Sequence, residues 1–267
     1  MGLIGRKVKA PKTKFGHRLG HEILCTNSGV KGVVSSITQQ IAGCEFLNFD
    51  CPIEVDGKTT IQPFTVSAVS AKILSNKKVE EYESSYINNA KSFSDIELGN
   101  KVKVIRSERV GILTERIFEL TGNVLFNIEF EYNPDSVMQD KSYEFTFAGG
   151  VKKVDEGVRP QLLENMRLRQ NDEIEVPKHF VRARSIVNGC EGVVVVDSQY
   201  SNGTYHIGIQ PDNRNNKKFD IEFFDIELIE IVKDEHQKEV IAEGNIKDGN
   251  KTGCTRYAGA HKICRTV

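Results

Sequence analysis

The chain has 267 residues, of which 39% are hydrophobic and 27% are charged, and its formal net charge is −1. This ordinary globular balance excludes a disordered or collagen-like chain, and it disfavours a general nucleic-acid coat, which would need a large basic excess. No apolar run approaches the ~18 residues of a membrane span, and residues 1–12 hold no apolar core of a secretory signal. We therefore expect a soluble, intracellular protein.

An internal repeat runs through most of the chain. Residues 19–23 (LGHEI) are echoed by residues 98–102 (LGNKV), an offset of 98 − 19 = 79, and a further offset of 81 reaches a third copy. These offsets align three pairs of glycines, each pair 11 residues apart: Gly32 and Gly43, Gly111 and Gly122, Gly192 and Gly203. Glycine fits tight turns and close backbone contacts because it has no Cβ, so we interpret all six as structural rather than ligand-binding.

Each copy reads as short strands separated by turns. In the third copy, Val193 to Val196 form a β-branched run, and Asn202-Gly203 is a dipeptide favoured in type I′ hairpins. Further alternating segments follow, which gives about five short strands per copy, the size of a small closed barrel. The fold class that we predict is mainly β, with three tandem small barrels joined by short connecting helices.

Two stretches between the copies have helical periodicity. Val79, Tyr82, Tyr86, Ala90 and Phe93 recur at spacings of three and four, and a second short helix is expected from Pro160 to Leu168. We expect the apolar faces of both helices to be buried against the barrels. The predicted organisation is a basic arm (1–18), repeat 1 (19–76), a helical linker (77–97), repeat 2 (98–158), a helical linker (159–178), repeat 3 (179–232) and a C-terminal extension (233–267).

The third copy resembles a family of short, uncharacterised bacteriophage proteins. The resemblance rests on Gly189 to Val193, Tyr200 to Gly203, Ile209 to Pro211 and the segment from Phe224 to Leu228, and it covers roughly fifty residues. It implies an SH3-like barrel and a viral origin, but no activity. The same strand and turn order is similar to KOW and Tudor modules, which is an analogy at the level of the fold only.

No catalytic constellation stands out in the sequence, so we expect a protein that is not an enzyme and needs no cofactor. Cys254, His261 and Cys264 lie close together near the end of the chain and, with His236, could form a tetrahedral zinc site. Paired Cys-x-x-Cys knuckles are missing, so buried thiols and a surface histidine are the preferred interpretation. His206 is expected on the exposed face of its strand.

Charge is distributed unevenly along the chain. Residues 1–18 hold six basic side chains and no acidic one, whereas residues 219–243 hold nine acidic and two basic side chains. Two interpretations of the arm stay open: it is solvated charge, or it docks on an acidic surface of another subunit or on nucleic acid. On the docking hypothesis, the binding residues are Arg6, Lys7, Lys9, Lys12, Lys14, Phe15 and Arg18.

These observations favour a non-enzymatic phage protein, a virion-associated or assembly module that binds protein surfaces through tandem β-barrels. Its partners would be other virion or host proteins, with homo-oligomers formed by contact between the basic arm and the acidic surface. The hairpins near residues 39–42, 119–121 and 199–202 are the expected contact loops. The alternative is an intracellular binder of nucleic acid or of a host transcription or defence factor. The expected location is the virion or the host cytoplasm.

Overall fold

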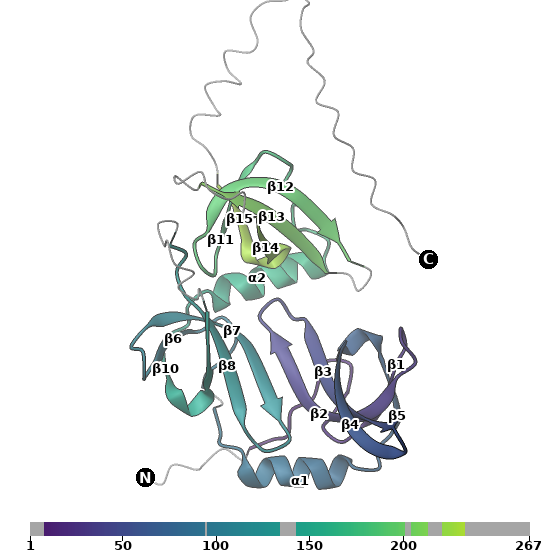
Figure 1. The fold of residues 1–267 in the computed structure, drawn as a ribbon. Coiled ribbons are helices and arrows are strands. Elements are labelled where there is room, and N and C mark those ends of the chain that lie inside the picture. The colour runs from purple at the N-terminus through teal and green to yellow at the C-terminus, as the bar shows by residue number, and fades with distance from the viewer. Residues whose placement is uncertain (1–7, 94, 134–142, 201–203, 213–220, 233–267) are drawn as a thin grey trace, which may run out of the picture. The chain divides into compact units, whose positions relative to one another are not determined.

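The computed structural model of the chain describes residues 8–93, 95–133, 143–200, 204–212 and 221–232 (Figure 1). All of them belong to one unit, Met1–Val232, and the second unit, Lys233–Val267, lies outside the described residues. The strands form curled antiparallel sheets, and among the described residues they are accompanied by two α-helices and three short 3-10 helices. The predicted mainly β fold class is therefore confirmed.

Three segments contain the same series of elements, namely four strands, a three-residue 3-10 helix and a fifth strand. Repeat 1 comprises β1 (Glu22–Cys25), β2 (Lys31–Gln40), β3 (Glu45–Val55), β4 (Lys58–Ser67), η1 (Ala68–Ser70) and β5 (Ala71–Ser75). Repeat 2 comprises β6 (Lys101–Val104), β7 (Val110–Glu119), β8 (Val124–Glu129), β9 (Tyr143–Phe147), η2 (Ala148–Gly150) and β10 (Val151–Asp155). Repeat 3 comprises β11 (Arg182–Ser185), β12 (Glu191–Gln199), β13 (Tyr205–Pro211), β14 (Glu222–Asp225), η3 (Ile226–Leu228) and β15 (Ile229–Ile231).

Strand pairing follows the same order in each repeat. The first strand pairs with the second and the fifth, the second with the third, and the third with the fourth. The second strand also contains the same irregularity each time, between Val34 and Ser36, between Leu113 and Glu115, and between Val194 and Val196. These positions are separated by the offsets of 79 and 81 found in the sequence. The description of each repeat as a closed SH3-like barrel stays a prediction, since the fourth and fifth strands of a repeat do not pair with each other in the described residues.

Repeats 1 and 2 share one ten-stranded sheet because β2 pairs antiparallel with β7. At the centre of this ladder Thr38 faces Ile117, which is its own counterpart at the offset of 79. The flanking hydrogen bonds are reciprocal: Ile41 N–H donates to Thr114 O (2.8 Å), and Leu120 N–H donates to Ser35 O (2.9 Å). The two repeats are thus related by a local pseudo-twofold axis, as the subunits of an isologous dimer would be.

Three of the repeat glycines lie where two strands approach closely. A Cβ on Gly32 would lie 2.5 Å from Asp50 O, and Cβ atoms on Gly111 and Gly192 would overlap Glu129 O and Gln210 O. These contacts leave no room for any larger residue.

The hairpin glycines have a different requirement. Gly43 and Gly122 have φ values of +84° and +86°, a left-handed conformation that glycine adopts without a Cβ penalty. Both hairpin tips also pack on a helix or its end. A Cβ on Gly43 would lie 3.0 Å from Met166 Cε, and one on Gly122 would lie 2.5 Å from Asn89 Cβ. Gly203 lies outside the described residues.

Both predicted helices are confirmed, as α1 (Val79–Asn89) after repeat 1 and α2 (Arg159–Gln170) after repeat 2. Tyr86 of α1 is 3% exposed and Leu162 of α2 is 2% exposed, so each helix buries one face. Pro160 lies in the first turn of α2, where the missing N–H has no helical partner to lose. Phe93 lies beyond the end of α1.

Two apolar cores lie under the sheets. The larger contains buried side chains of repeats 1 and 2 and Tyr86 of α1, and the second contains the core of repeat 3 together with Leu162 of α2. Ile41, the residue after β2, belongs to the second core and is only 6% exposed. The expectation that the hairpin at residues 39–42 is an exposed contact loop is therefore wrong, because β7 pairs with β2 there and Ile41 packs inward.

Within the part of the chain that the structure describes, no helix is long and apolar enough to cross a membrane.

Candidate functional site

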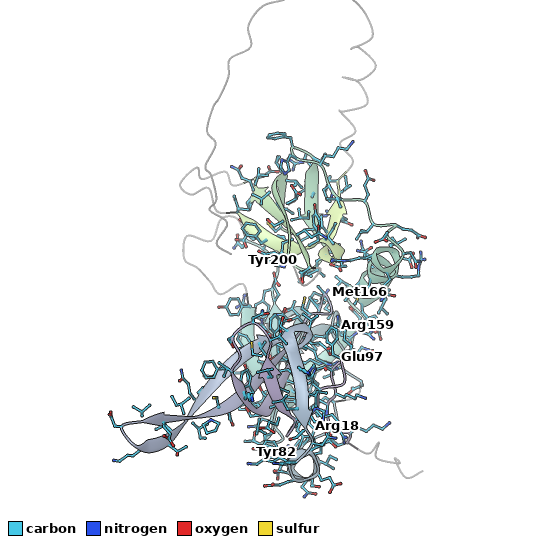
Figure 2. All side chains as sticks on the ribbon, turned by 90° about the vertical axis from the view of Figure 1, so that its right-hand side faces the viewer. Arg18, Tyr82, Glu97, Arg159, Met166 and Tyr200 are labelled. Atoms are coloured by element: carbon cyan, nitrogen blue, oxygen red, sulfur yellow. The ribbon has the colours of Figure 1, made fainter. Side chains whose placement is uncertain are left out.

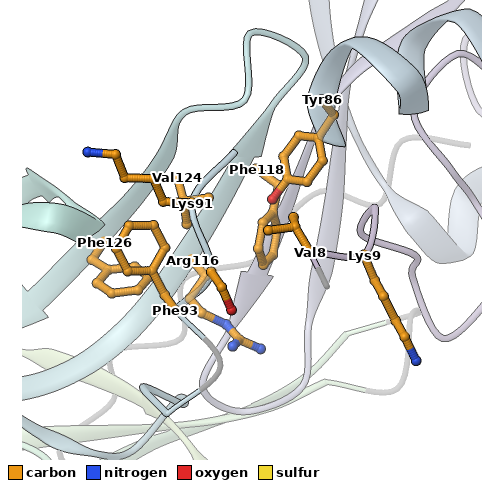
Figure 3. A pocket seen from close by; sticks show the side chains of 10 residues that line it. Val8, Lys9, Tyr86, Lys91, Phe93, Arg116, Phe118, Val124 and Phe126 are labelled. Carbon is orange, nitrogen blue, oxygen red and sulfur yellow. The ribbon is translucent and has the colours of Figure 1, made fainter. Parts of the chain in front are cut away.

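A cavity of about 450 Å³ lies beside α1, between the N-terminal segment and the sheet of repeat 2 (Figure 3). Its walls include four aromatic rings, those of Tyr86, Phe93, Phe118 and Phe126. Three cationic side chains also line it, those of Lys9, Lys91 and Arg116, and none of its described lining residues is acidic. Such a lining suits a small ligand with an apolar body and a negative group.

Arg116 is the central polar group of this cavity. Its Nη2 donates to Gln39 Oε1 (3.1 Å) and its Nη1 lies 3.5 Å from Ile96 O, while its buried Nε has no hydrogen-bond partner among the described residues. Burial lowers the pKa of Arg116 and raises the pKa of Tyr86 to about 12, so Tyr86 is a neutral hydroxyl at physiological pH. The described side chains that line this cavity include hydrogen-bond donors but no carboxylate, histidine or cysteine.

A second, polar cavity of about 150 Å³ lies among side chains of repeats 1 and 3 and of α2. Cys44 Sγ lies 3.5 Å from Thr204 Oγ1, and Arg169 Nη1 donates to Glu227 Oε1 at 2.6 Å. Burial raises the pKa of the Cys44 thiol and that of the Glu227 carboxyl. A raised thiol pKa is the opposite of what a nucleophilic cysteine needs, so this cavity does not activate Cys44.

His206, expected on an exposed face, is half-buried instead. Its Nε2 lies 3.1 Å from Asp225 Oδ1, and its ring lies 4.8 Å from the ring of Tyr200. Ile207 and Ile209 are fully buried, as the alternation predicts, but Gly208 between them is buried as well. The neighbouring strand β14 places Asp225 against the imidazole of His206. The burial of that carboxyl raises the pKa of Asp225.

The described residues of the predicted basic arm contact different parts of the protein, namely α1, repeat 1 and both cavities. Arg18 (labelled in Figure 2) donates hydrogen bonds to the carboxylate of Glu83 on α1. Lys14 Nζ donates to Gly43 O at 2.8 Å. The backbone of Lys12 forms an isolated antiparallel β-bridge with the backbone of Arg18. Lys9 lines the aromatic cavity, and Phe15 lines the polar cavity. Arg6 and Lys7 lie outside the described residues. The structure does not bring the five described arm residues together in one patch, and the binding role of the arm stays a prediction.

Two acidic residues of repeat 3 form ion pairs with arginines of the same chain. Glu227 pairs with Arg169, and Glu230 pairs with Arg184 at 2.7 Å. Cys254, His261, Cys264 and His236 lie outside the described residues, so the zinc hypothesis is untested. In the ranges that the structure describes, no group of three or more His, Cys, Asp or Glu side chains could hold a metal ion.

A stripe of aromatic side chains on β9 is a feature that the sequence did not predict. Tyr143, Phe145 and Phe147 are 47%, 51% and 59% exposed, and the intervening Glu144 and Thr146 face the other way. The rings of Tyr143 and Phe145 pack edge to face, with centroids 5.9 Å apart. We call these three residues the β9 stripe. Alternating apolar residues normally indicate a strand face that is buried in the core. Only comparison with repeat 1 could have indicated that this face of β9 is exposed, because repeat 1 has Pro63, Thr65 and Ser67 at the equivalent positions before its 3-10 helix.

No family model matches the chain, and no curated protein matches it significantly.

Proposed function

We propose that the chain is a non-enzymatic phage protein, a virion-associated or assembly module that binds protein surfaces through three SH3-like repeats. The observation that carries the proposal is the β9 stripe. Three exposed aromatic rings in a row on one short strand present a contiguous apolar surface to water. Contiguous surfaces of this kind mark interaction sites, whereas exposed apolar residues scattered singly do not. Aromatic residues are also the side chains most enriched at protein interfaces.

The position of the stripe favours a protein partner. In the described residues β9 pairs only with β8, so its other edge offers backbone N–H and C=O groups beside the aromatic rings. A partner segment in an extended conformation could use both features, with hydrogen bonds along the edge and apolar contacts over the rings. Leu125 of β8 lies opposite Phe147 and widens the apolar face.

The SH3-like description is supported by the strand order and by the 3-10 helix between the fourth and fifth strands of every repeat. The phage origin is supported by the resemblance of repeat 3 to bacteriophage proteins. Neither feature assigns a reaction, and the described residues of the two cavities include no activated nucleophile.

The first test is mass spectrometry of gradient-purified virions of the phage that encodes the chain. We expect a fixed number of copies per particle. A variant with Phe145→Thr and Phe147→Ser, the residues that repeat 1 has at these positions, should be lost from particles at least about tenfold, since buried aromatic residues are typical interface hot spots.

The matched control is Phe223→Thr on β14, where an equally exposed aromatic side chain stands on the corresponding strand of repeat 3 without the two aromatic neighbours. It should enter particles like the wild type, and all variants should keep the wild-type melting curve. If the wild-type protein is missing from virions but abundant in the infected cell, the virion proposal fails and the host partner becomes the target.

A further inference from the structure

The edge of β2 that joins repeats 1 and 2 has a counterpart in repeat 3. The second half of β2, Ser36 to Gln40, pairs with β7, and the offset of 79 + 81 = 160 places its counterpart at Val196 to Tyr200. In the described residues β12 pairs with β11 and β13, and β11 reaches only to Val193. Beyond Val194, this edge therefore has no strand beside it in the part of the chain that the structure describes.

The backbone groups on this open edge can be assigned from the repeat. Ser35 O bonds to Leu120, the residue after β7, and Ile41 N–H bonds to Thr114 of β7. The alternate residues between them, Ile37 and Gln39, therefore direct their backbone groups to the same side. The counterparts of those two residues are Asp197 and Gln199. Tyr200 N–H bonds inward to Thr204 O, as this alternation requires.

We propose that a second copy of this chain occupies the edge, with β12 of each copy paired antiparallel about a twofold axis at Ser198. The chain already contains an internal dimer of the same kind. β2 and β7 are equivalent strands that pair with each other about Thr38 and Ile117, and β12 is the third copy of the same strand, left without an equivalent strand among the described residues of its own chain. This proposal goes beyond the proposed function and does not depend on the β9 stripe.

The side chains of β12 suit pairing with a copy of themselves. Around Ser198, the register places Val196 opposite Tyr200 of the other copy and Asp197 opposite Gln199. Val196 is half-buried and Tyr200 is 50% exposed, so the pair joins a β-branched and an aromatic side chain, a favourable cross-strand combination. In this register Asp197 of one copy does not lie directly opposite Asp197 of the other copy, so the two negative charges are not placed against each other. The Asp197 carboxylate contacts Tyr205 and His179 of its own chain. Both contacts involve only the side chain of Asp197, so they do not use the backbone groups that would pair with the second copy.

The test uses the full chain in analytical ultracentrifugation. The wild-type protein should be a dimer. Gln199→Pro removes an outward N–H from each copy without breaking a bond inside repeat 3, and it should weaken the dimer roughly tenfold or more. Gln199→Ala, which keeps the N–H, should leave the dimer intact. Both variants should keep the far-UV circular dichroism spectrum of the wild type, which would show that the strands stay folded; the melting temperature itself should fall with the dimer in Gln199→Pro.

Cysteine substitution locates the axis. Ser198→Cys should form a disulfide between two copies under mild oxidation, identified by peptide mapping as a link between position 198 of one copy and position 198 of the other, because residues directly opposite on a non-hydrogen-bonded pair come closest. Gln199→Cys, whose opposite residue is Asp197, should form far less. A monomeric wild type, or a dimer that survives Gln199→Pro, overturns the proposal. If the dimer is lost instead when residues 1–14 are deleted, association depends on the basic arm. If it is lost in the variant with Phe145→Thr and Phe147→Ser, association depends on the β9 stripe.

Discussion

At the scale of single residues, the repeat shows which positions are constrained by the backbone. Gly20 and Gly99 have φ values of +81° and +86°, and each N–H bonds to the second strand, to Val34 O and Leu113 O. The offset of 81 places Phe180 at the same position in repeat 3, with φ +67° and the equivalent bond to Val194 O. Phe180 therefore has a conformation that its side chain disfavours, and that side chain is 79% exposed.

We predict that Phe180→Gly stabilises the protein. Left-handed backbone costs an L-residue about 1–2 kcal/mol, and the extra freedom of an unfolded glycine offsets roughly 0.5–1 kcal/mol of that, so a net gain of ~0.5–1 kcal/mol remains. Urea unfolding measures it. Lys178→Gly, two residues earlier and without a positive φ, should destabilise slightly, and a loss of stability in Phe180→Gly would contradict the repeat alignment.

Glu129 gives the protein a pH-dependent stability. Burial raises its pKa to about 7, although Asn188 Nδ2 donates to its Oε1 at 2.6 Å, and the nearby charge of Glu222 adds to the shift. Between pH ~4.5 and ~7 the folded state therefore holds a proton that the unfolded state has released, so the free energy of unfolding falls as the pH rises.

We predict that Glu129→Gln flattens this dependence. The glutamine carbonyl still accepts from Asn188 and cannot ionise, so the variant should gain stability over the wild type at pH 8 and little at pH 5. Thermal melts across this range provide the measurement, with Glu131→Gln at a neighbouring exposed position as the control. Parallel pH profiles for wild type and Glu129→Gln would show that Glu129 is not the responsible group.

At the scale of elements, the two helices contact the hairpins of the opposite repeat. Gly43 of repeat 1 lies against α2, which follows repeat 2, and Gly122 of repeat 2 lies against the end of α1, which follows repeat 1. Arg159 at the start of α2 is also paired with Glu97, 2.8 Å away (Figure 2). The helices thus stabilise the arrangement of the repeats as well as their own connections.

The packing of α2 can be tested at two adjacent leucines. Leu162 is 2% exposed within the second core, whereas Leu163 is 50% exposed. We predict that Leu162→Ala costs about 2–4 kcal/mol of unfolding free energy and Leu163→Ala less than about 0.5 kcal/mol. Equal effects in chemical denaturation would mean that α2 does not pack as described.

Much of this arrangement could be predicted from the residues themselves. The glycine spacing predicted the three repeats, and the apolar spacing of Tyr82 and Tyr86 predicted α1, because turns and helices depend on neighbours in the chain. The pairing of β2 with β7 could not be predicted, since an edge is joined through backbone groups that nearly every residue has. The β9 stripe was not foreseen for a related reason: alternation shows that a strand has two faces, but does not show which one remains exposed.

At the scale of the whole molecule, one strand edge occurs three times. Two copies of the edge pair inside the chain, and the third is proposed to pair with a second chain. Both the shared sheet of repeats 1 and 2 and the inference for β12 require that Thr38 and Ile117 lie directly opposite each other.

A double-cysteine variant, Thr38→Cys with Ile117→Cys, measures that contact most directly. We predict a disulfide within one chain on mild oxidation, assigned by peptide mapping, because these residues occupy a non-hydrogen-bonded pair in which side chains lie closest. Neither single variant should form this link. If the native double variant yields no disulfide between positions 38 and 117, β2 and β7 are not paired in this register, and the case for a second copy at β12 falls with it.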